Sequence, residues 1–296
     1  MKNVLVSLGG LYMKNKISFS WDLHWSCNYR CPYCWWHGKW DEFGKRNVYP
    51  GLDKLIGVWK RIYDLYGEVH LEIAGGEPSI YPQFSEFILE VLKYHTVSIM
   101  TNLSGDLDKI INSDDENVKT RFKIGATFHP MFGNIDEFLK KAKKIRERKM
   151  AIGILYLSYP PQIPDIPKYK QLFKDNNIYF SVSTFWGEYN GKKYPDSYTD
   201  EEKKIIGIAI GERKDEKFQT EPLITKGKLC NAGHTYALIH PDGEVLPCGG
   251  ASWKGEQVII GNIFDPNFKL WDNPRECPSD HCPCNEWAFL MVDKNK

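Results

Sequence analysis

The chain has 296 residues, of which 42% are hydrophobic and 26% charged, and its formal net charge is +1. This length suits about two domains of roughly 150 residues, enough to bury a substantial core. The balanced charge excludes the basic footprint of a nucleic-acid-binding protein, and no stretch is long and apolar enough to cross a bilayer. We therefore expect neither nucleic acid nor a membrane as a partner.

The first 16 residues contain a short apolar run but no convincing small-residue cleavage site, so a secretory signal is not expected. We expect a cytoplasmic, reducing location. In such a compartment the eight cysteines of the chain more often bind metal or carry out redox chemistry than form disulfides.

Apolar runs and helical patterns alternate from residue 18 to residue 186. Strands are expected at 18–25, 68–74, 95–102, 122–129, 150–159 and 178–185. Helices are expected at 51–67, 82–94, 106–112, 134–149 and 166–177. Six strands separated by helices predict an α/β fold with a parallel sheet, either doubly wound or closed toward a barrel. In both architectures the chemistry lies at the carboxyl ends of the strands.

The first strand alternates strictly between apolar and polar residues. One face is expected to carry Phe19, Trp21, Leu23 and Trp25. The polar Asp22 and His24 then point to the opposite side, where they either contact a substrate or hydrogen-bond within the core.

Three cysteines come directly after this strand, with the spacing C-x3-C-x2-C: Cys27, Cys31 and Cys34. Three thiolates can bind three irons of a [4Fe–4S] cluster and leave the fourth iron open to a small molecule. The other reading is a zinc site completed by His24 or His37.

Other polar or glycine-rich segments occupy later strand ends. Gly75, Gly76 and Glu77 begin the GGEP sequence, which taken alone reads as a strand-to-helix turn. Asn102 and Thr127 end two further strands. Asn102 has an equally good interpretation as a helix cap, and His129 reads either as a substrate contact or as a core histidine. The tryptophans Trp35, Trp36 and Trp40 either cover a site at the carboxyl ends of the strands or simply cover the end of the barrel.

The pattern changes after Trp186. Residues 187–198 are expected to form a loop, and residues 199–212 a helix opened by a capping box of Thr199 and Glu202. A β-hairpin is expected around the Asp242–Gly243 turn, and its fold-back brings Cys230 and Cys248 together.

Five cysteines remain in this second part, enough for one four-ligand metal site and a spare. We expect the ligands to be Cys230, Cys248, Cys282 and Cys284. Cys277 is the expected spare or substitute. A structural zinc site at the same place is the alternative, because thiol-rich sites bind either metal.

The triad with aromatic Tyr33 before its last cysteine, followed by GGEP after the second strand, resembles the radical SAM superfamily. The resemblance implies a partial (β/α)6 TIM-type barrel over residues 18–190, after an N-terminal segment 1–17. It also implies that a [4Fe–4S] cluster on the triad binds S-adenosylmethionine. Its cofactor contacts would be Tyr33, Gly75, Gly76, Glu77, Asn102 and Thr127, whereas no catalytic acid or base can be named.

The C-x12-G-x4-C pattern from Cys230 to Cys248 resembles the SPASM and Twitch auxiliary-cluster domains. This implies a small cysteine-rich domain at 229–296, which follows a linker with a helix at 191–228. The domain is expected to hold one auxiliary iron–sulfur cluster of the [4Fe–4S] type.

The expected function is that of a radical SAM oxidoreductase or maturase. The resemblance implies reductive cleavage of S-adenosylmethionine to a 5′-deoxyadenosyl radical and hydrogen abstraction from a small molecule or a peptidyl side chain. A low-potential electron donor such as flavodoxin or ferredoxin is implied as a partner. The alternative is a zinc-stabilised binding module without redox chemistry.

Overall fold

The computed structural model describes residues 17–210, 223–250, 258–282 and 290–292. Its main sheet has nine strands in the order β13-β12-β11-β1-β2-β3-β4-β5-β6. Six of them are β1 (Ser18–His24), β2 (His70–Gly75), β3 (Thr96–Thr101), β4 (Phe122–Thr127), β5 (Ala151–Leu157) and β6 (Tyr179–Ser183). Neighbours among these six pair in parallel. The predicted α/β class with a large parallel sheet is therefore confirmed.

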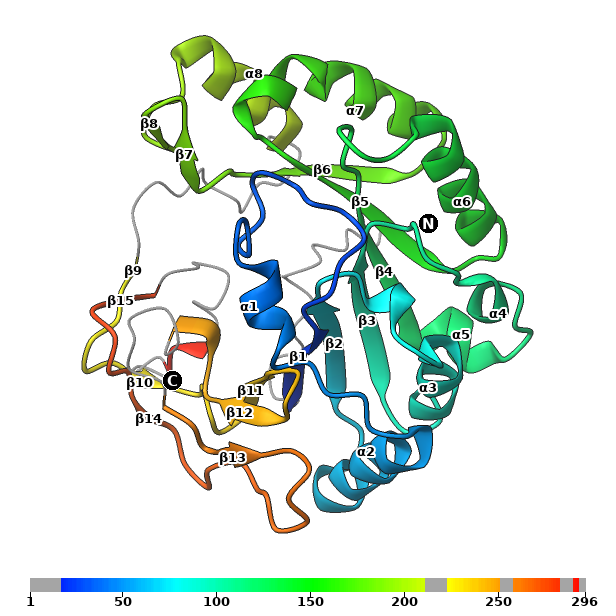
Figure 1. The fold of residues 1–296 in the computed structure, drawn as a ribbon, viewed down its shortest axis with the longest axis vertical. Helices are drawn as coiled ribbons and strands as arrows, with labels where there is room; N and C mark the ends of the chain where they lie inside the picture. The colour runs from blue at the N-terminus through cyan, green and yellow to red at the C-terminus, as the bar shows by residue number, and fades with distance from the viewer. Residues whose placement is uncertain (1–16, 211–222, 251–257, 283–289, 293–296) are drawn as a thin grey trace.

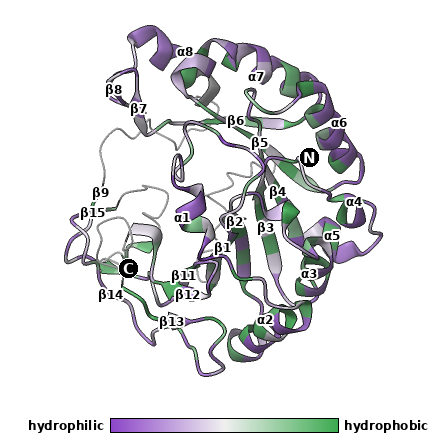
Figure 2. Ribbon diagram, in the orientation of Figure 1, coloured by the Kyte–Doolittle hydropathy of each residue, from purple (hydrophilic) through white to green (hydrophobic). Residues whose placement is uncertain are grey.

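Helices follow the strands and cover one side of the sheet. They are α2 (Leu52–Tyr66), α3 (Phe84–Val91), α4 (Asp108–Ile111), α6 (Ile135–Glu147) and α7 (Ile166–Asp175). Figure 1 shows the six strands curving in an arc with these helices on its outer side, and Figure 2 shows hydrophilic residues on their outward faces. In α6 the basic residues are on the solvent side, because Phe138, Ala142 and Ile145 are the buried ones. None of the described helices is long and apolar enough to span a membrane.

The outer face of β1 packs on α2. Phe19, Trp21 and Leu23 are each at most 1% exposed. The Trp59 ring of α2 lies 5.7 Å from the rings of both Phe19 and Trp21. Alternation along β1 leaves Asp22 on the inner, concave face, as predicted. His24 lies beyond a shift in the pairing register and does not line the cavity; its ring contacts the Glu77 carbonyl inside the protein.

The prediction that Trp25 shares the face of Trp21 is wrong. The pairing register of β1 with β2 shifts between Asp22 and His24, and β1 ends there. Beyond this bulge the Trp25 indole N–H donates to Asp22 Oδ2 at 3.0 Å. A bulge re-aims the side chains that follow it, so a strict alternation pattern fails at that point.

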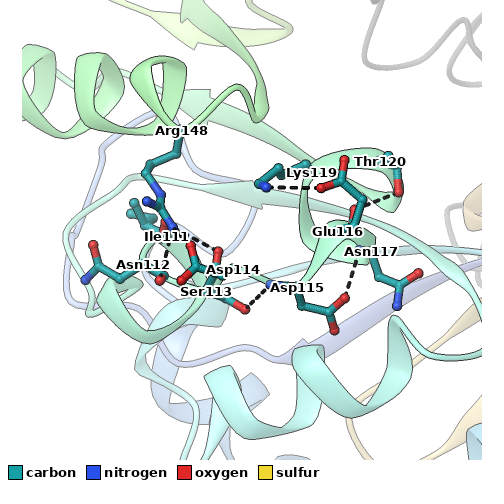
Figure 3. Close-up of polar contacts among 10 residues, drawn as sticks. All are labelled: Ile111, Asn112, Ser113, Asp114, Asp115, Glu116, Asn117, Lys119, Thr120 and Arg148. Atoms are coloured by element: carbon teal, nitrogen blue, oxygen red, sulfur yellow. Dashed lines mark hydrogen bonds and ion pairs between the residues drawn. The ribbon is translucent and has the colours of Figure 1, made fainter.

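Two short helices were not predicted, α1 (Trp40–Gly44) and α5 (Glu116–Arg121). Asp115 caps α5, because its carboxylate accepts from the Asn117 N–H at 2.9 Å. The preceding turn is held by Arg148 at the end of α6, which donates to the carbonyls of residues 111–113 (Figure 3). The helix is too short to show helical periodicity, whereas its aspartate cap is visible in the sequence.

Residues 187–198 were predicted as a loop, and this is wrong for residues 187–194. They contain an antiparallel hairpin of β7 (Gly187–Tyr189) and β8 (Lys192–Tyr194). Its turn is Asn190–Gly191, with φ of 49° and 72°, the dipeptide most typical of a tight hairpin turn. The helix that follows, α8 (Asp200–Ile210), has the predicted capping box: the Glu202 N–H donates to Thr199 Oγ1 at 3.2 Å.

The C-terminal part continues the main sheet. Strand β11 (Tyr236–Ile239) pairs in parallel with β1, and β12 (Glu244–Leu246) and β13 (Gly261–Asn262) extend the sheet antiparallel. The predicted hairpin is thus confirmed, and its turn residue Gly243 has a φ of +85°. A Cβ at Gly243 would lie 2.4 Å from the Phe264 ring, so this close turn requires glycine.

The remaining strands are very short. The pairs are β9 (Leu223–Ile224) with β15 (His281–Cys282), and β10 (Leu229–Cys230) with β14 (Arg275–Glu276). Two 3₁₀ turns, η1 (Pro78–Ile80) and η2 (Pro160–Asp165), complete the described elements.

Candidate functional site

A cavity of about 540 Å³ lies at the carboxyl ends of the six parallel strands. Its lining includes the three triad cysteines and also every residue predicted to contact the cofactor: Tyr33, Gly75, Gly76, Glu77, Asn102 and Thr127. Residues from separate strand ends therefore meet at one place, as parallel strand topology requires.

The triad loop is a tight turn whose sulfurs are embedded in protein. The Cys34 N–H donates to the Cys31 carbonyl at 3.1 Å, and the Tyr29 N–H donates to Cys27 Sγ at 3.3 Å. Burial raises the pKa of the Cys31 thiol to about 12. Because thiolates are the form that binds metal, loading this loop must release protons.

The spacing of the sulfurs distinguishes the kinds of metal site. Among the residues that the structure describes, three potential ligand atoms come within 4.8 Å of one another only at His240, Asp242 and Glu244. The triad sulfurs are more widely spread than around a single zinc, where Zn–S bonds of about 2.3 Å place sulfurs roughly 3.8 Å apart. A wide spread suits a multi-iron cluster, which holds each cysteine at a different iron.

Neither histidine considered as a fourth zinc ligand lines the cavity. His24 is buried, and its Nε2 lies 2.9 Å from the Glu77 carbonyl. His37 is exposed, with its ring 5.4 Å from the Trp40 ring.

The GGEP loop is joined directly to the triad loop. The Gly76 N–H donates to the His24 carbonyl at 2.7 Å, and the Glu77 N–H donates to the Ser26 carbonyl at 2.9 Å. A Cβ at Gly76 would lie 1.9 Å from the Ser26 oxygen. Gly75 has a φ of +116°, which L residues rarely adopt. These glycines are thus required for the close approach of the two loops.

The Glu77 carboxylate organises this wall. Its Oε1 accepts from the Ser79 N–H at 3.0 Å, from the Ser79 hydroxyl and from the Thr101 hydroxyl at 2.6 Å. Its Oε2 accepts from the Asn102 N–H at 2.6 Å. Asn102 in turn donates to Asn28 Oδ1 of the triad loop at 3.1 Å. Glu77 therefore connects the ends of β2 and β3 to the triad.

Asn102 is not a helix cap. Its side-chain oxygen accepts from the Ser104 N–H at 2.8 Å, and α4 begins only at Asp108. Of the two interpretations of Asn102, the structure supports the one that places it in the site.

His129 completes the wall beside the triad. Its Nδ1 lies 3.0 Å from Tyr33 Oη and 3.6 Å from Cys31 Sγ. The rings of His129 and Tyr33 are stacked, with centroids 5.8 Å apart. Burial lowers the pKa of His129 to about 4, so its imidazole is neutral near pH 7. The sequence did not decide whether His129 contacts a substrate or lies in the core, and the structure places it in the cavity wall.

Some residues that line the cavity were not predicted from the sequence. They are Glu72, Met100, Leu155, Leu157, Ser183, Thr184, Phe185 and Trp186. Glu72 alternates with the buried Leu71 and Ile73 in β2. The same alternation rule that placed Asp22 would have placed Glu72 on the inner face. The three tryptophans of the triad region, Trp35, Trp36 and Trp40, also line the cavity.

Asp22 lies on the cavity wall, half-buried, and burial raises its pKa from 3.8 to about 6. Its pKa in the folded chain is thus higher than in the unfolded chain. The associated stability is present below pH 4 and is lost as the pH rises through 6. At 1.36 kcal/mol per pH unit this rise amounts to about 3 kcal/mol.

We expect Asp22→Asn to raise the free energy of unfolding by ~1–3 kcal/mol at pH 7.5 and to leave it nearly unchanged at pH 4. Urea denaturation of the reduced, cluster-free chain at both pH values measures this. Asp64→Asn, at an exposed position of α2, is the matched control. An equal effect of Asp22→Asn at the two pH values contradicts the assignment.

A second group of thiols gathers in the C-terminal part. Burial raises the pKa of Cys230 to about 12, and three neighbouring thiols add to the rise. These neighbours are Cys248, Cys277 and Cys282. The approach of Cys230 and Cys248 predicted from the hairpin is confirmed. Cys284 lies outside the described residues.

Cys277 reaches this group through strand pairing. Residues 223–230 run antiparallel to residues 275–282. The Cys277 N–H therefore donates to the Lys228 carbonyl at 2.9 Å, two residues from Cys230. Sequence spacing alone does not show this pairing.

Arg46 ties the C-terminal hairpin to the triad region. Its Nε donates to Asp242 Oδ2 at 2.6 Å and its Nη2 to Glu244 Oε2 at 2.5 Å. Its guanidinium also lies over the Trp25 ring, 5.2 Å from the centroid. The His240, Asp242 and Glu244 group has ligand chemistry for a metal, but both of its carboxylates are already ion-paired with Arg46.

No protein-family model and no curated sequence matches the chain. SuiB from Streptococcus suis superposes with a TM-score of 0.58 at 16% identity, over 84% of this chain and 64% of SuiB. The protein anSMEcpe with bound AdoMet superposes with a TM-score of 0.54 at 17% identity, over 93% of this chain and 83% of anSMEcpe. SuiB has also been crystallised with S-adenosylmethionine.

The chain thus spans slightly less than two thirds of the length of SuiB. At these identities the likeness establishes the fold. The chain shares the fold of the radical SAM enzymes SuiB and anSMEcpe, as its cysteine triad and GGEP sequence predicted.

Proposed function

We propose that the chain is a radical SAM enzyme built on a partial (β/α)6 barrel with a C-terminal auxiliary-cluster region. One observation carries this proposal. The triad loop, the GGEP loop and Asn102 are hydrogen-bonded into one wall of a single cavity. The wide spacing of the three sulfurs supports a cluster in place of a single zinc.

When bound, a [4Fe–4S] cluster at the triad would supply the electron that splits S-adenosylmethionine into methionine and the 5′-deoxyadenosyl radical. The chain would hold the cluster with Cys27, Cys31 and Cys34. The backbone of residues 75–76 borders the same cavity and is available to the methionine part. Because most of the Glu77 carboxylate is engaged by the protein, we assign Glu77 mainly to positioning Asn102. Tyr33 and Thr127 remain proposed contacts of the nucleoside.

The proposal is tested by anaerobic reconstitution with iron and sulfide, followed by dithionite and S-adenosylmethionine. We expect 5′-deoxyadenosine as a product. A chain that carries a complete cluster and forms none would contradict the proposal. Metal analysis of the purified chain tests the alternative, a zinc-stabilised module, which contains zinc and no iron.

The substrate is proposed to be a small molecule or a peptidyl side chain. SuiB has been crystallised with its precursor peptide SuiA, and anSMEcpe with the Cp18Cys peptide. These complexes support a peptide as the substrate of this chain. A flavodoxin or ferredoxin is the proposed electron donor.

The second thiol group is proposed to bind one auxiliary [4Fe–4S] cluster through Cys230, Cys248, Cys277 and Cys282. Their mutual proximity in the fold supports this set. Four cysteines would coordinate all four irons of the cluster and leave no open position for a substrate. This favours a role in electron transfer over a role in substrate binding.

We expect Cys277→Ala to lower the iron content of the reconstituted chain from about eight to about four atoms, because each [4Fe–4S] cluster needs its cysteine ligands. Cys284→Ala is the matched control and should keep all the iron. Iron analysis and the visible absorbance measure both variants. Loss of iron from Cys284→Ala with retention in Cys277→Ala would reverse the ligand assignment.

A further inference from the structure

The backbone of His129 is fixed at the cavity wall next to the triad. His129 lies two residues beyond the end of β4, where the Phe128 N–H still donates to the Leu155 carbonyl of β5 at 3.0 Å. The His129 carbonyl then accepts from the Phe132 N–H at 3.0 Å and from the Gly133 N–H at 2.8 Å. These bonds hold the chain on both sides of the histidine.

Two tyrosines of the triad loop orient the imidazole ring. The Tyr33 ring stacks on it with an interplanar angle of 16°, and the Tyr29 ring meets it edge-on, with centroids 6.0 Å apart. In this orientation Nδ1 faces the triad loop. It lies 3.0 Å from Tyr33 Oη and 3.6 Å from Cys31 Sγ.

The sulfurs of Cys27 and Cys31 have different kinds of neighbour. Cys27 Sγ accepts from a backbone group, the Tyr29 N–H, at 3.3 Å. Cys31 Sγ has a side chain at hydrogen-bond distance, and that side chain is 98 residues away in the sequence. The hydrogen bond at Cys31 therefore depends on the identity of one side chain, His129.

The neighbours of Nδ1 favour one tautomer of His129 when the triad holds iron. A thiolate bound to iron has no proton and only accepts hydrogen bonds, whereas a tyrosine hydroxyl donates or accepts. An N–H at Nδ1 satisfies both neighbours. A bare nitrogen would place its lone pair against the negative sulfur, which is unfavourable in a part-buried site. The loaded triad thus selects the tautomer with its proton on Nδ1.

We infer that His129 is a positioning residue whose Nδ1–H donates to the Cys31 thiolate and raises the reduction potential of the cluster at the triad. This inference rests on the proposed function and adds a residue that adjusts its cofactor. The reduced cluster carries one more negative charge than the oxidised cluster. A donor directed at its sulfur therefore stabilises the reduced form more.

Three substitutions separate the hydrogen bond from the shape of the side chain. His129→Leu and His129→Asn have nearly the same shape, but only asparagine can donate. His129→Phe keeps a ring beside Tyr33 and has no donor. The potential of each reconstituted chain is measured by anaerobic reductive titration with electron paramagnetic resonance. The signal followed is the one that changes when S-adenosylmethionine is added, because this marks the cluster with an open iron.

We expect His129→Leu and His129→Phe to lower the equilibrium constant for one-electron reduction at least ~threefold, which is about 28 mV at 59 mV per tenfold change. His129→Asn should stay within about threefold of the wild-type chain. His70→Leu is the matched control. His70 begins β2 at the end of the strand away from the cavity, where its Nδ1 lies 3.0 Å from Thr96 Oγ1, so this substitution should leave the potential unchanged.

A shift smaller than this in His129→Leu and His129→Phe overturns the inference. An equal shift in His129→Asn and His129→Leu also overturns it, because the shape of the side chain then explains the change. If one of the two variants without a donor holds no cluster, the other decides. Loss of the cluster from all three variants contradicts the inference as well, since His129 would then be needed for assembly.

Failure of the proposed function gives a different result. In that case the wild-type chain forms no 5′-deoxyadenosine and shows no signal that responds to S-adenosylmethionine. A wild-type chain that does both, with the same potential in the His129 variants, contradicts this inference alone. The potential depends on the electronic surroundings of the cluster and not on turnover.

Discussion

Replacing Cys31 with alanine is expected to abolish the formation of 5′-deoxyadenosine. Cys31 is the most buried cysteine of the triad, and its sulfur lies beside His129 and Tyr33 in the cavity wall. A cluster held by two cysteines lacks a third iron ligand, so it should not assemble stably at this loop. The product is measured by chromatography after reduction with dithionite.

Iron analysis shows whether the loss is specific. Cys31→Ala should retain about four iron atoms at the second thiol group, whereas Cys284→Ala should keep both the iron and the product. Product formation by the Cys31→Ala chain at the wild-type rate would exclude the triad as the cofactor site.

Replacing Glu77 with alanine is expected to lower the free energy of unfolding by at least ~3 kcal/mol. The substitution leaves the Ser79 hydroxyl, the Thr101 hydroxyl and the Asn102 N–H without their acceptor inside the protein. Each buried donor without a partner costs about 1–3 kcal/mol. Urea denaturation of the reduced chain measures the change.

Glu90→Ala provides the comparison, because the Glu90 carboxylate forms only a surface ion pair with Lys93 at 2.6 Å. Such surface pairs are screened by water and contribute little to stability. If Glu77→Ala were no more destabilising than Glu90→Ala, the carboxylate would not organise the wall as described. The same variant should also weaken S-adenosylmethionine binding, since Asn102 loses the group that positions it.

The two thiol groups differ in the number of cysteines that the fold brings together. The triad loop supplies three, and the cavity opens directly on them. The C-terminal strand pairs bring four together. This difference fits an open iron at the first site and a closed cluster at the second, which is the basis of their proposed division of roles.

Strand periodicity was a dependable guide where both faces of a strand were buried in regular order. The six parallel strands and their helices follow from alternating and helical patterns, since these patterns report directly which side chains leave water. The pattern failed at Trp25, where a bulge of one residue turns the side chain towards Asp22. It also missed the β7–β8 hairpin, whose Asn190–Gly191 turn was readable but whose strands are too short to alternate.

The sequence by itself determined the identity and order of the groups that meet at the site. The cysteine spacing, GGEP, Asn102 and Thr127 could be assigned because each follows a strand, and parallel strands end at one edge. Only the tertiary structure decided how these groups interact. Glu77 turns inward to hold Thr101 and Asn102, Cys277 joins Cys230 through strand pairing, and Asp22 and Glu72 share a cavity. Such contacts join residues far apart in the chain, and no local pattern encodes their distances.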